Sequence, residues 1–276
     1  MLEAIYERRS IRTFKKTPLK KSDVKKIIEL LKNTEAKHGP FNTAVKFFIL
    51  EDSFTPQDQK TKVGTYGFVK NPQGFIGGKT VNSFEALIDF GYLFESIILA
   101  LTNLNIGTVW LGGTFKRKQF DHLLSEGEFI PAISPIGYIE EKQTLREKLI
   151  RKKIKANQRK PFETLFFDQN TEEPISKSHP LAHLLELVQL APSASNKQPW
   201  IVTLDHHAVH FFLNRTPNYA SMLSYDIQAL DLGIAIQHFE TGLMASSIPY
   251  TRVHIKDTIV FKDYQYILSF RLERTS

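Results

Sequence analysis

The sequence of 276 residues contains no cysteine. Disulfides, thiolate zinc sites and cysteine nucleophiles are therefore excluded. No apolar run approaches the roughly 18 residues of a membrane span, and residues 1–14 carry charges where a signal peptide needs an apolar stretch. The sequence also lacks a Walker phosphate loop and a Gly-x-Gly-x-x-Gly turn after a strand. We expect a cytoplasmic protein with no membrane partner and no Rossmann nucleotide site.

Length and composition indicate a folded chain of one large domain or two fused ones. Hydrophobic residues make up 42% of the sequence and aromatic residues 12%, which is enough apolar surface for a large core. The net charge of +7 is uneven, because residues 1–170 hold 28 Lys and Arg against 19 Asp and Glu, whereas residues 171–276 hold 8 against 10. The basic part could attract nucleic acid or a nucleotide phosphate, or could simply be solvated.

Helix and strand signals run through the first 140 residues. Apolar residues at helical spacing follow Ser22, a candidate N-cap. A stretch punctuated by glycines, from Gly64 to Gly78, precedes a long segment that is apolar on nearly all sides, as in a buried central helix. The expected elements are a helix over 24–31, a strand over 44–50, the long helix over 84–104, and strands over 108–110 and 133–139.

The same order of elements recurs after Pro180. The two long helices share an Asp-x-Gly pattern, at Asp89–Gly91 and at Asp231–Gly233. We interpret the chain as two half-domains, residues 1–170 and 171–276, although any two helix–strand units look partly alike at this level. The second set of expected elements is a helix over 181–190, strands over 200–204 and 209–213, a long helix over 225–246 and a strand over 264–272.

The segment that joins the halves is strongly basic. Between Lys142 and Lys160, nine of nineteen residues are Lys or Arg. This run is an exposed helix or a solvated linker by default. Aromatic residues that could stack on bases are sparse there, which argues against nucleic acid as a partner.

Four stretches carry a more specific signal. Residues 8–14 read Arg-Arg-Ser-Ile-Arg-Thr-Phe, and residues 191–200 read Ala-Pro-Ser-Ala-Ser-Asn-Lys-Gln-Pro-Trp. Residues 106–115 read Ile-Gly-Thr-Val-Trp-Leu-Gly-Gly-Thr-Phe, and residues 159–162 read Arg-Lys-Pro-Phe. Together these motifs resemble the signatures of the FMN-dependent nitroreductase family.

The order of the motifs differs from that of a standard family member. There, the Asn-x-Gln-Pro-Trp loop follows the arginines by about thirty residues, and two subunits share each flavin. Here the loop comes after residue 190, while residues 33–42 have lost the signature and the second half lacks the arginine motif. The arrangement resembles the fused branch of the family. The resemblance implies an α+β, nitroreductase-like fold of two tandem half-domains, with antiparallel or mixed sheets and long buried helices, that forms an internal pseudo-dimer and runs as a monomer.

The resemblance also implies the residues that bind FMN. Guanidinium groups grip phosphate oxygens and stay charged, so a phosphate clamp is expected at the arginines, and an arginine nearer the N1 edge would stabilise the reduced ring. In the second signature, small residues would let the backbone approach the ring while amides read its pyrimidine edge. The glycine turn would place a backbone N–H near N5. The expected residues are Arg8, Arg9, Ser10, Arg12, Arg159 and Lys160; Leu111, Gly112, Gly113 and Thr114; and Pro192, Ser193, Ala194, Ser195, Asn196 and Gln198.

No side chain stands out as a general acid or nucleophile, and flavin chemistry does not require one. The nine histidines show no metal-ligand spacing, and His238 on the second long helix is best interpreted as a core residue. The resemblance implies an oxidoreductase that passes electrons from NAD(P)H through FMN to a small electron-poor acceptor, such as a nitroaromatic or a quinone. A flavin-binding carrier or sensor with little turnover is the alternative.

Overall fold

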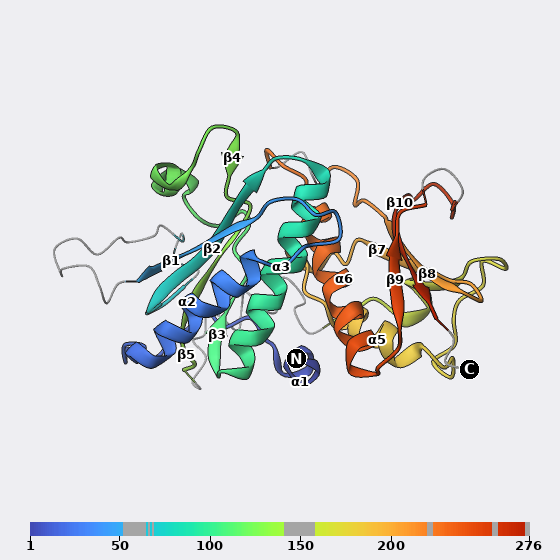
Figure 1. Ribbon diagram of the computed structural model, residues 1–276, viewed down its shortest axis with the longest axis horizontal. Helices are drawn as coiled ribbons and strands as arrows, with labels where there is room; N and C mark the ends of the chain where they lie inside the picture. The colour runs from blue at the N-terminus through green and yellow to red at the C-terminus, as the bar shows by residue number, and fades with distance from the viewer. Residues whose placement is uncertain are drawn as a thin grey trace.

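The fold is given by a computed structural model that describes residues 1–51, 65, 67, 69–140, 158–219, 223–255 and 259–273. Two sheets stand at opposite ends of the molecule, and two long helices, α3 (Phe84–Asn103) and α6 (Ile227–Ala245), lie side by side between them (Figure 1). Most of the predicted basic connector, and Gly64 of the glycine-punctuated stretch, lie outside the described residues.

The first sheet has the strand order β1-β2-β5-β3, and β4 pairs with β2. All of its pairs are antiparallel. A short parallel bridge from Ser10 to Thr108 ties the N-terminal arm to β3. The strands are β1 (Lys46–Glu51), β2 (Gly74–Val81), β3 (Ile106–Thr108), β4 (Glu128–Phe129) and β5 (Ile133–Tyr138).

The second sheet has the order β6-β7-β8-β10-β9, in which β6 runs parallel to β7 and the other pairs are antiparallel. Apart from β4 and β6, the two sheets correspond strand for strand in order along the chain. The predicted α+β fold with antiparallel and mixed sheets is therefore confirmed. The strands are β6 (Phe166–Asp168), β7 (Trp200–Leu204), β8 (Ala208–Leu213), β9 (Tyr250–Val253) and β10 (Gln265–Leu272).

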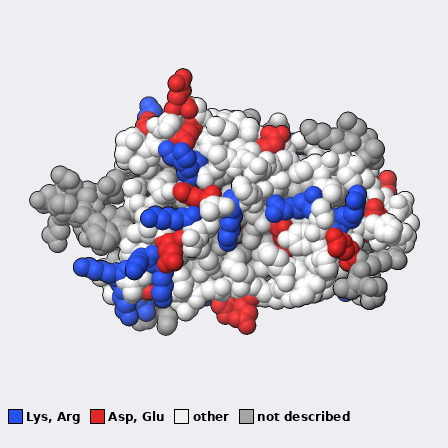
Figure 2. Space-filling view, viewed as in Figure 1, with Lys and Arg blue, Asp and Glu red and all other residues white. Residues whose placement is uncertain are grey.

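The other helices flank this frame. Among the described helices, none has both the length and the apolarity to cross a membrane. Lys and Arg side chains gather at the lower left of Figure 2, where Figure 1 shows α2, and the lysines at 21, 25, 26 and 32 of this helix are exposed, so part of the basic surplus is a solvated helix face. The elements are α1 (Leu2–Glu7), α2 (Lys21–Glu35), α5 (Ala182–Leu190) and the 3-10 turns η2 (Arg117–Leu123), η3 (Phe162–Thr164) and η4 (Ala194–Asn196).

The structure corrects two details of the sequence prediction. The glycine-punctuated stretch contains strand β2, whose Gly77 and Gly78 leave room for the rings of Phe48 and Phe47 on the neighbouring strand. Side-chain alternation could not identify this strand, because its glycines have no side chain. Helix α2 begins at Lys21, with no side-chain cap, so the predicted N-cap at Ser22 is wrong.

Strand β6 bears on the predicted division at residue 170. Its residues precede that position, yet β6 pairs with β7 and so belongs to the second sheet. The chain therefore reaches the second half by Phe166, and residues 158–165 run along that half before it. The exact domain boundary stays a prediction.

Two glycines allow the close packing of α3 on α6. A Cβ at Gly91 would lie closer than 3.0 Å to the backbone of Leu230, and a Cβ at Gly233 would lie equally close to the backbone of Ile88. The contact is reciprocal, since Gly91 and Gly233 each follow the aspartate of the Asp-x-Gly pattern by two residues. Because backbone atoms cannot move aside as a side chain can, a methyl group at either position separates the helices.

We predict that Gly91→Ala and Gly233→Ala each destabilise the fold by about 2–4 kcal/mol, since overpacking costs about 1–3 kcal/mol even where side chains can yield. Urea unfolding measures this change. Gly113→Ala is the matched control, because its Cβ would meet its nearest neighbour, a Leu223 methyl, at an ordinary 3.4 Å. Equal midpoints for all three variants would contradict the packing described here.

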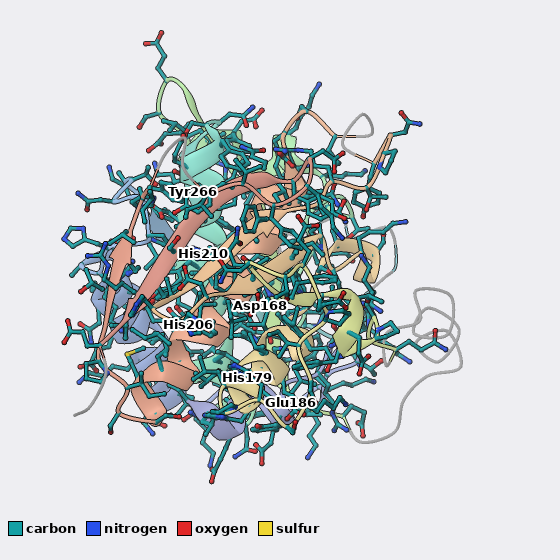
Figure 3. All side chains as sticks on the ribbon, turned by 90° about the vertical axis from the view of Figure 1, so that its right-hand side faces the viewer. Asp168, His179, Glu186, His206, His210 and Tyr266 are labelled. Atoms are coloured by element: carbon teal, nitrogen blue, oxygen red, sulfur yellow. The ribbon has the colours of Figure 1, made fainter. Side chains whose placement is uncertain are left out.

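A buried polar network supports the second sheet. His210 Nε2 lies 3.1 Å from Asp205 Oδ2, and His210 Nδ1 lies 2.6 Å from Ser269 Oγ, which contacts Tyr266 Oη at 2.8 Å. Figure 3 labels His210 and Tyr266 of this network. Ser269 is wholly buried, so this serine–histidine–aspartate arrangement offers no accessible nucleophile. Burial lowers the pKa of His210, and Asp205 offsets part of that shift.

Acid should weaken the fold through His210. The unfolded chain takes up a proton near the ordinary histidine pKa of about 6.5, whereas the folded chain does so only at lower pH, so stability falls as the pH drops through this interval. We predict that His210→Gln lowers the urea midpoint at pH 7 but flattens its decline between pH 7 and 5. His206→Gln, at an exposed position, should keep the wild-type slope. An unchanged slope in His210→Gln would refute this assignment.

Candidate active site

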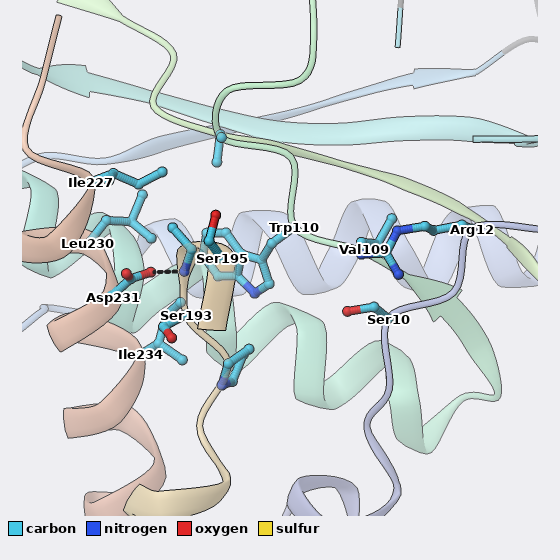
Figure 4. A pocket seen from close by; sticks show the side chains of 14 residues that line it. Ser10, Arg12, Val109, Trp110, Ser193, Ser195, Ile227, Leu230, Asp231 and Ile234 are labelled. Carbon is cyan, nitrogen blue, oxygen red and sulfur yellow. Dashed lines mark hydrogen bonds between the residues drawn. The ribbon is translucent and has the colours of Figure 1, made fainter. Parts of the chain in front are cut away.

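A pocket opens between the two halves, beside the α3–α6 pair (Figure 4). The first half contributes its N-terminal arm and the segment after β3, and the second half contributes the loop around η4 and one face of α6. Its lining is mostly apolar, with an arginine and serines among the polar members. The lining residues are Ser10, Arg12, Val109, Trp110, Gly112, Ala132, Pro192, Ser193, Ala194, Ser195, Ile227, Leu230, Asp231 and Ile234.

The η4 loop is held in an uncommon backbone conformation. Ser195, Asn196 and Gln198 all have positive φ angles, between 48° and 57°. Such angles are costly for residues other than glycine and are found most often at functional sites. Two hydrogen bonds brace the loop, from the Ala194 N–H to Asp231 Oδ1 at 2.9 Å and from the Gln198 N–H to Ser193 Oγ at 2.8 Å.

Asp231 is the polar side chain that anchors this loop to α6. It is 2% exposed, and its Oδ2 has no hydrogen-bond partner among the described residues. Burial raises the pKa of Asp231 well above its ordinary value, and the nearby Asp226 adds to the shift, whereas the Ala194 N–H opposes it. Burial therefore disfavours a negative charge on this wall of the pocket.

The first half has an equivalent loop, but its side chains fill the space. Asp89 accepts hydrogen bonds from the Phe41 and Thr43 N–H groups at 2.8 and 2.7 Å, and the intervening Asn42 has a φ of 58°, as Ser195 has a φ of 49°. Where the η4 loop has Ala194, this loop has Phe41, whose ring packs against His254 with centroids 4.6 Å apart. The two loops share a backbone design and differ in the bulk of their side chains.

The turn at Gly112 is held in place by side chains that pack against it and hydrogen-bond to its backbone. A Cβ at Gly112 would lie 2.8 Å from Ile227 Cδ1 and 3.0 Å from Tyr225 Oη, so the turn packs closely against side chains of the second half. Tyr225 donates a hydrogen bond to the Pro131 carbonyl at 2.8 Å, and Arg117 donates to the same carbonyl at 3.0 Å and to that of Gly112. These contacts set the position of the backbone that lines the pocket.

Cations gather at one end of the site. Arg159 donates to the Leu190 carbonyl at 3.0 Å and to Asn196 Oδ1 at 3.2 Å. Burial lowers the pKa of Arg159 to about 10, and the charge of nearby Arg8 adds to the shift. The guanidinium groups of Arg8, whose side chain is 8% exposed, and of the half-buried Arg159 repel each other, and such a pair forms a site that an anion would stabilise.

Lys160 belongs to the same end of the site. Its backbone N–H donates to Gln198 Oε1 at 3.0 Å, and its ammonium group donates to the Gln198 carbonyl at 3.1 Å. Burial lowers the pKa of Lys160, with a further contribution from Lys197. Asn196 Nδ2 donates to the Gln158 carbonyl at 2.7 Å. The described contacts of Asn196 and Gln198 thus hold the 158–160 segment against the η4 loop.

The structure brings most of the predicted residues together. Arg9 is exposed and borders another cavity with Thr102 and Ile139. Leu111 is buried in an apolar cluster, while Gly113 and Thr114 continue the turn beyond the lining. The predicted residues that line the pocket are Ser10, Arg12, Gly112, Pro192, Ser193, Ala194 and Ser195, and those of the adjoining arginine end are Arg8, Arg159, Lys160, Asn196 and Gln198.

Sequence analysis missed the contribution of α6. Its apolar face supplies Ile227, Leu230 and Ile234, which a hydrophobic pattern cannot distinguish from core residues. Asp231 had a usable signal, because the Asp-x-Gly pattern put a charged residue in an otherwise apolar helix. Trp110 lay within a quoted motif, but its part in the pocket depends on a contact with α3 that spacing does not predict.

Two sheets around a central helix pair, with a pocket where the halves meet, define a nitroreductase-like protein. The chain belongs to the nitroreductase family, since the sequence model of the family described as "Putative TM nitroreductase" matches residues 1–243. It is thus a nitroreductase-family oxidoreductase. No match was found among curated proteins.

Solved nitroreductase-family structures are similar to this chain to different extents. A "putative nitroreductase" from Thermotoga maritima is similar over 98% of this chain and 92% of its own, with 21% identity and a TM-score of 0.61. A nitroreductase family protein from Clostridium novyi covers 50% of this chain and 84% of its own, with 20% identity and a TM-score of 0.39. A "Putative NADH Oxidase" from Clostridium acetobutylicum covers 51% of this chain and 89% of its own, with 22% identity and a TM-score of 0.40.

Proposed function

We propose that this oxidoreductase binds one FMN between its two halves and uses it to pass electrons from NAD(P)H to a small electron-poor acceptor, such as a nitroaromatic or a quinone. The observation that carries the proposal is that an apolar slot adjoins a pair of largely enclosed arginines, Arg8 and Arg159. A flat ring suits the slot, and a phosphate suits the arginines. FMN would supply hydride transfer, and NAD(P)H would approach its open face.

The residues present fit this cofactor. Arg8 and Arg159 would hold the phosphate, with Lys160 beside them, and Ser10 would donate a hydrogen bond. Arg12, which is 9% exposed in the pocket wall, would face the ring and stabilise negative charge on its reduced form. The apolar face of α6 would exclude water from one side of the ring.

The backbone around the slot would set the orientation of the ring. The loop from Pro192 to Ser195 presents small side chains, so the main chain can approach a planar group closely. On the opposite wall, the Gly112 turn presents backbone that Tyr225 and Arg117 hold in place. Asn196 and Gln198 would act indirectly, because they hold Arg159 and Lys160 in position.

FMN titration and NAD(P)H oxidation test the proposal. The protein should bind FMN, and menadione should stimulate NAD(P)H oxidation by the loaded protein. Arg12→Ala should weaken FMN binding by roughly tenfold to a hundredfold. A hydrogen bond to a charged group contributes about 1.5–3 kcal/mol, which corresponds to this loss of affinity. Arg9→Ala removes an arginine of the same motif that lies outside the pocket, so it should bind FMN as the wild type does.

The outcomes separate the two functions considered. Failure of the wild type to bind FMN would refute both. Flavin that binds but is not reduced by NADH or NADPH would favour the carrier instead of the enzyme. Equal losses in Arg12→Ala and Arg9→Ala would contradict the location of the site.

We also propose a monomer with one FMN per chain. Phe41 and His254 pack together at the equivalent loop in the first half, and the second half, with its own sheet, would take the place of a partner subunit. Light scattering should give a mass near 31.7 kDa, and flavin titration should saturate at one equivalent. A mass near twice that value, or saturation at two equivalents, would contradict this proposal.

A further inference from the structure

A carboxylate and an imidazole are buried together beside the arginine end of the site. Glu95 comes from α3 and His238 from α6, and both are 0% exposed. Glu95 Oε1 lies 3.0 Å from His238 Nε2 and 3.8 Å from Arg8 Nε, while its Oε2 accepts a 2.7 Å hydrogen bond from Trp110 Nε1. One carboxylate therefore joins the two long helices to a wall of the pocket and to the arginine pair.

The geometry determines how many protons this pair holds. His238 Nδ1 lies 2.9 Å from the Leu187 carbonyl, which can only accept, so Nδ1 carries a proton. His238 Nε2 faces a carboxylate oxygen, so a second proton lies between these two atoms. Glu95 is surrounded by donors from His238, Trp110 and Arg8, an environment that favours its ionised form. We therefore assign both ring protons to His238 and a negative charge to Glu95.

The pair exists on one side of the molecule only. The register that relates Asp89 to Asp231 and Gly91 to Gly233 relates Glu95 to Gln237 and His238 to Ser96. The same register relates Asn105 to Ser247, which have φ angles of 55° and 53° after α3 and α6. Gln237 and Ser96 line a separate cavity with Tyr92 and Tyr250. The charged pair thus lies on the side of the helix pair that has the arginines, and its uncharged counterparts lie on the other side.

The charged groups that surround Glu95 and His238 determine how the charges at this end of the site add up. Arg8, from the segment after α1, is the cation that faces Glu95, and Arg159 lies near it. Helix α5 contributes only the neutral Leu187 carbonyl, and Trp110 is also neutral. Because the charge of His238 cancels that of Glu95, Glu95 does not neutralise Arg8, and Arg8 and Arg159 together present positive charge to a ligand. A phosphate monoester carries close to two negative charges at pH 7.

We propose that Glu95 and His238 are positioning residues that tune the arginine end for a phosphate monoester dianion: Glu95 aligns Arg8 and Trp110, and His238 cancels the charge of Glu95 so that this carboxylate does not neutralise Arg8. The inference rests on the proposed function because the phosphate in question is that of FMN. It adds that the preference for FMN over riboflavin, which lacks the phosphate, depends on this buried pair.

A double-mutant cycle tests the inference. His238→Gln leaves the Glu95 carboxylate without its compensating charge, so Arg8 should pair with Glu95, and FMN binding should weaken by about tenfold or more. Riboflavin binding should change by less than about threefold, because the ring end is untouched. In Glu95→Gln/His238→Gln both partners are neutral, and FMN affinity should return to within about threefold of the wild type.

Ser96→Ala, at the position related to His238, is the matched control and should bind both flavins as the wild type does. A double variant as weak as His238→Gln, or parallel losses of FMN and riboflavin, would overturn the inference and leave the pair a merely structural contact.

The protonation of His238 can be measured without flavin. Nitrogen NMR of the flavin-free protein should show both ring nitrogens of His238 protonated at pH 7, with His238→Gln providing the assignment. A ring with one proton would overturn the inference even if a variant fails to fold. If the wild type binds no FMN, the proposed function fails, whereas normal FMN binding with a singly protonated His238 refutes this inference alone.

Discussion

The rest of the structure depends on the contact of α3 with α6 through Gly91 and Gly233. Each glycine lets the backbone of the opposite helix approach, and the pair brings two sheets into one molecule. The pocket lies beside this contact, so its walls come from both halves: Arg12 and Gly112 from the first, and the η4 loop from the second. A chain that could not pack these helices closely would have the residues of the site but no slot between them.

The two halves share the same arrangement of strands and a long helix, and they differ in the side chains of the loops. Aspartates of both long helices anchor a loop with a left-handed residue, yet the loop of the second half has Ala194 where that of the first half has Phe41. One side leaves a slot, and the other is filled by packed rings. The internal charges follow the same asymmetry, because Glu95 and His238 have Gln237 and Ser96 as their counterparts.

The sequence predicted the frame and the motifs better than the contacts. Helical periodicity located α3 and α6, and the signatures located Arg12 and the small residues of the η4 loop, because these features are local. Strand β2 was not predicted because glycines replace the alternating side chains. Strand β6 was not predicted because it is defined by its pairing with β7, a strand distant in the sequence. His238 was expected in the core and is found there, bonded to Leu187 and Glu95. His238 and Glu95 are 143 residues apart in the chain, on different helices, so no local sequence spacing could predict that they pair.

A co-crystal structure with FMN would show where the flavin binds. We expect flavin density in a single place per chain, with the ring between Arg12 and the Pro192–Ser195 loop and the phosphate at Arg8 and Arg159. Flavin bound instead in the cavity beside Tyr92 and Tyr250, or at both places, would contradict this expectation.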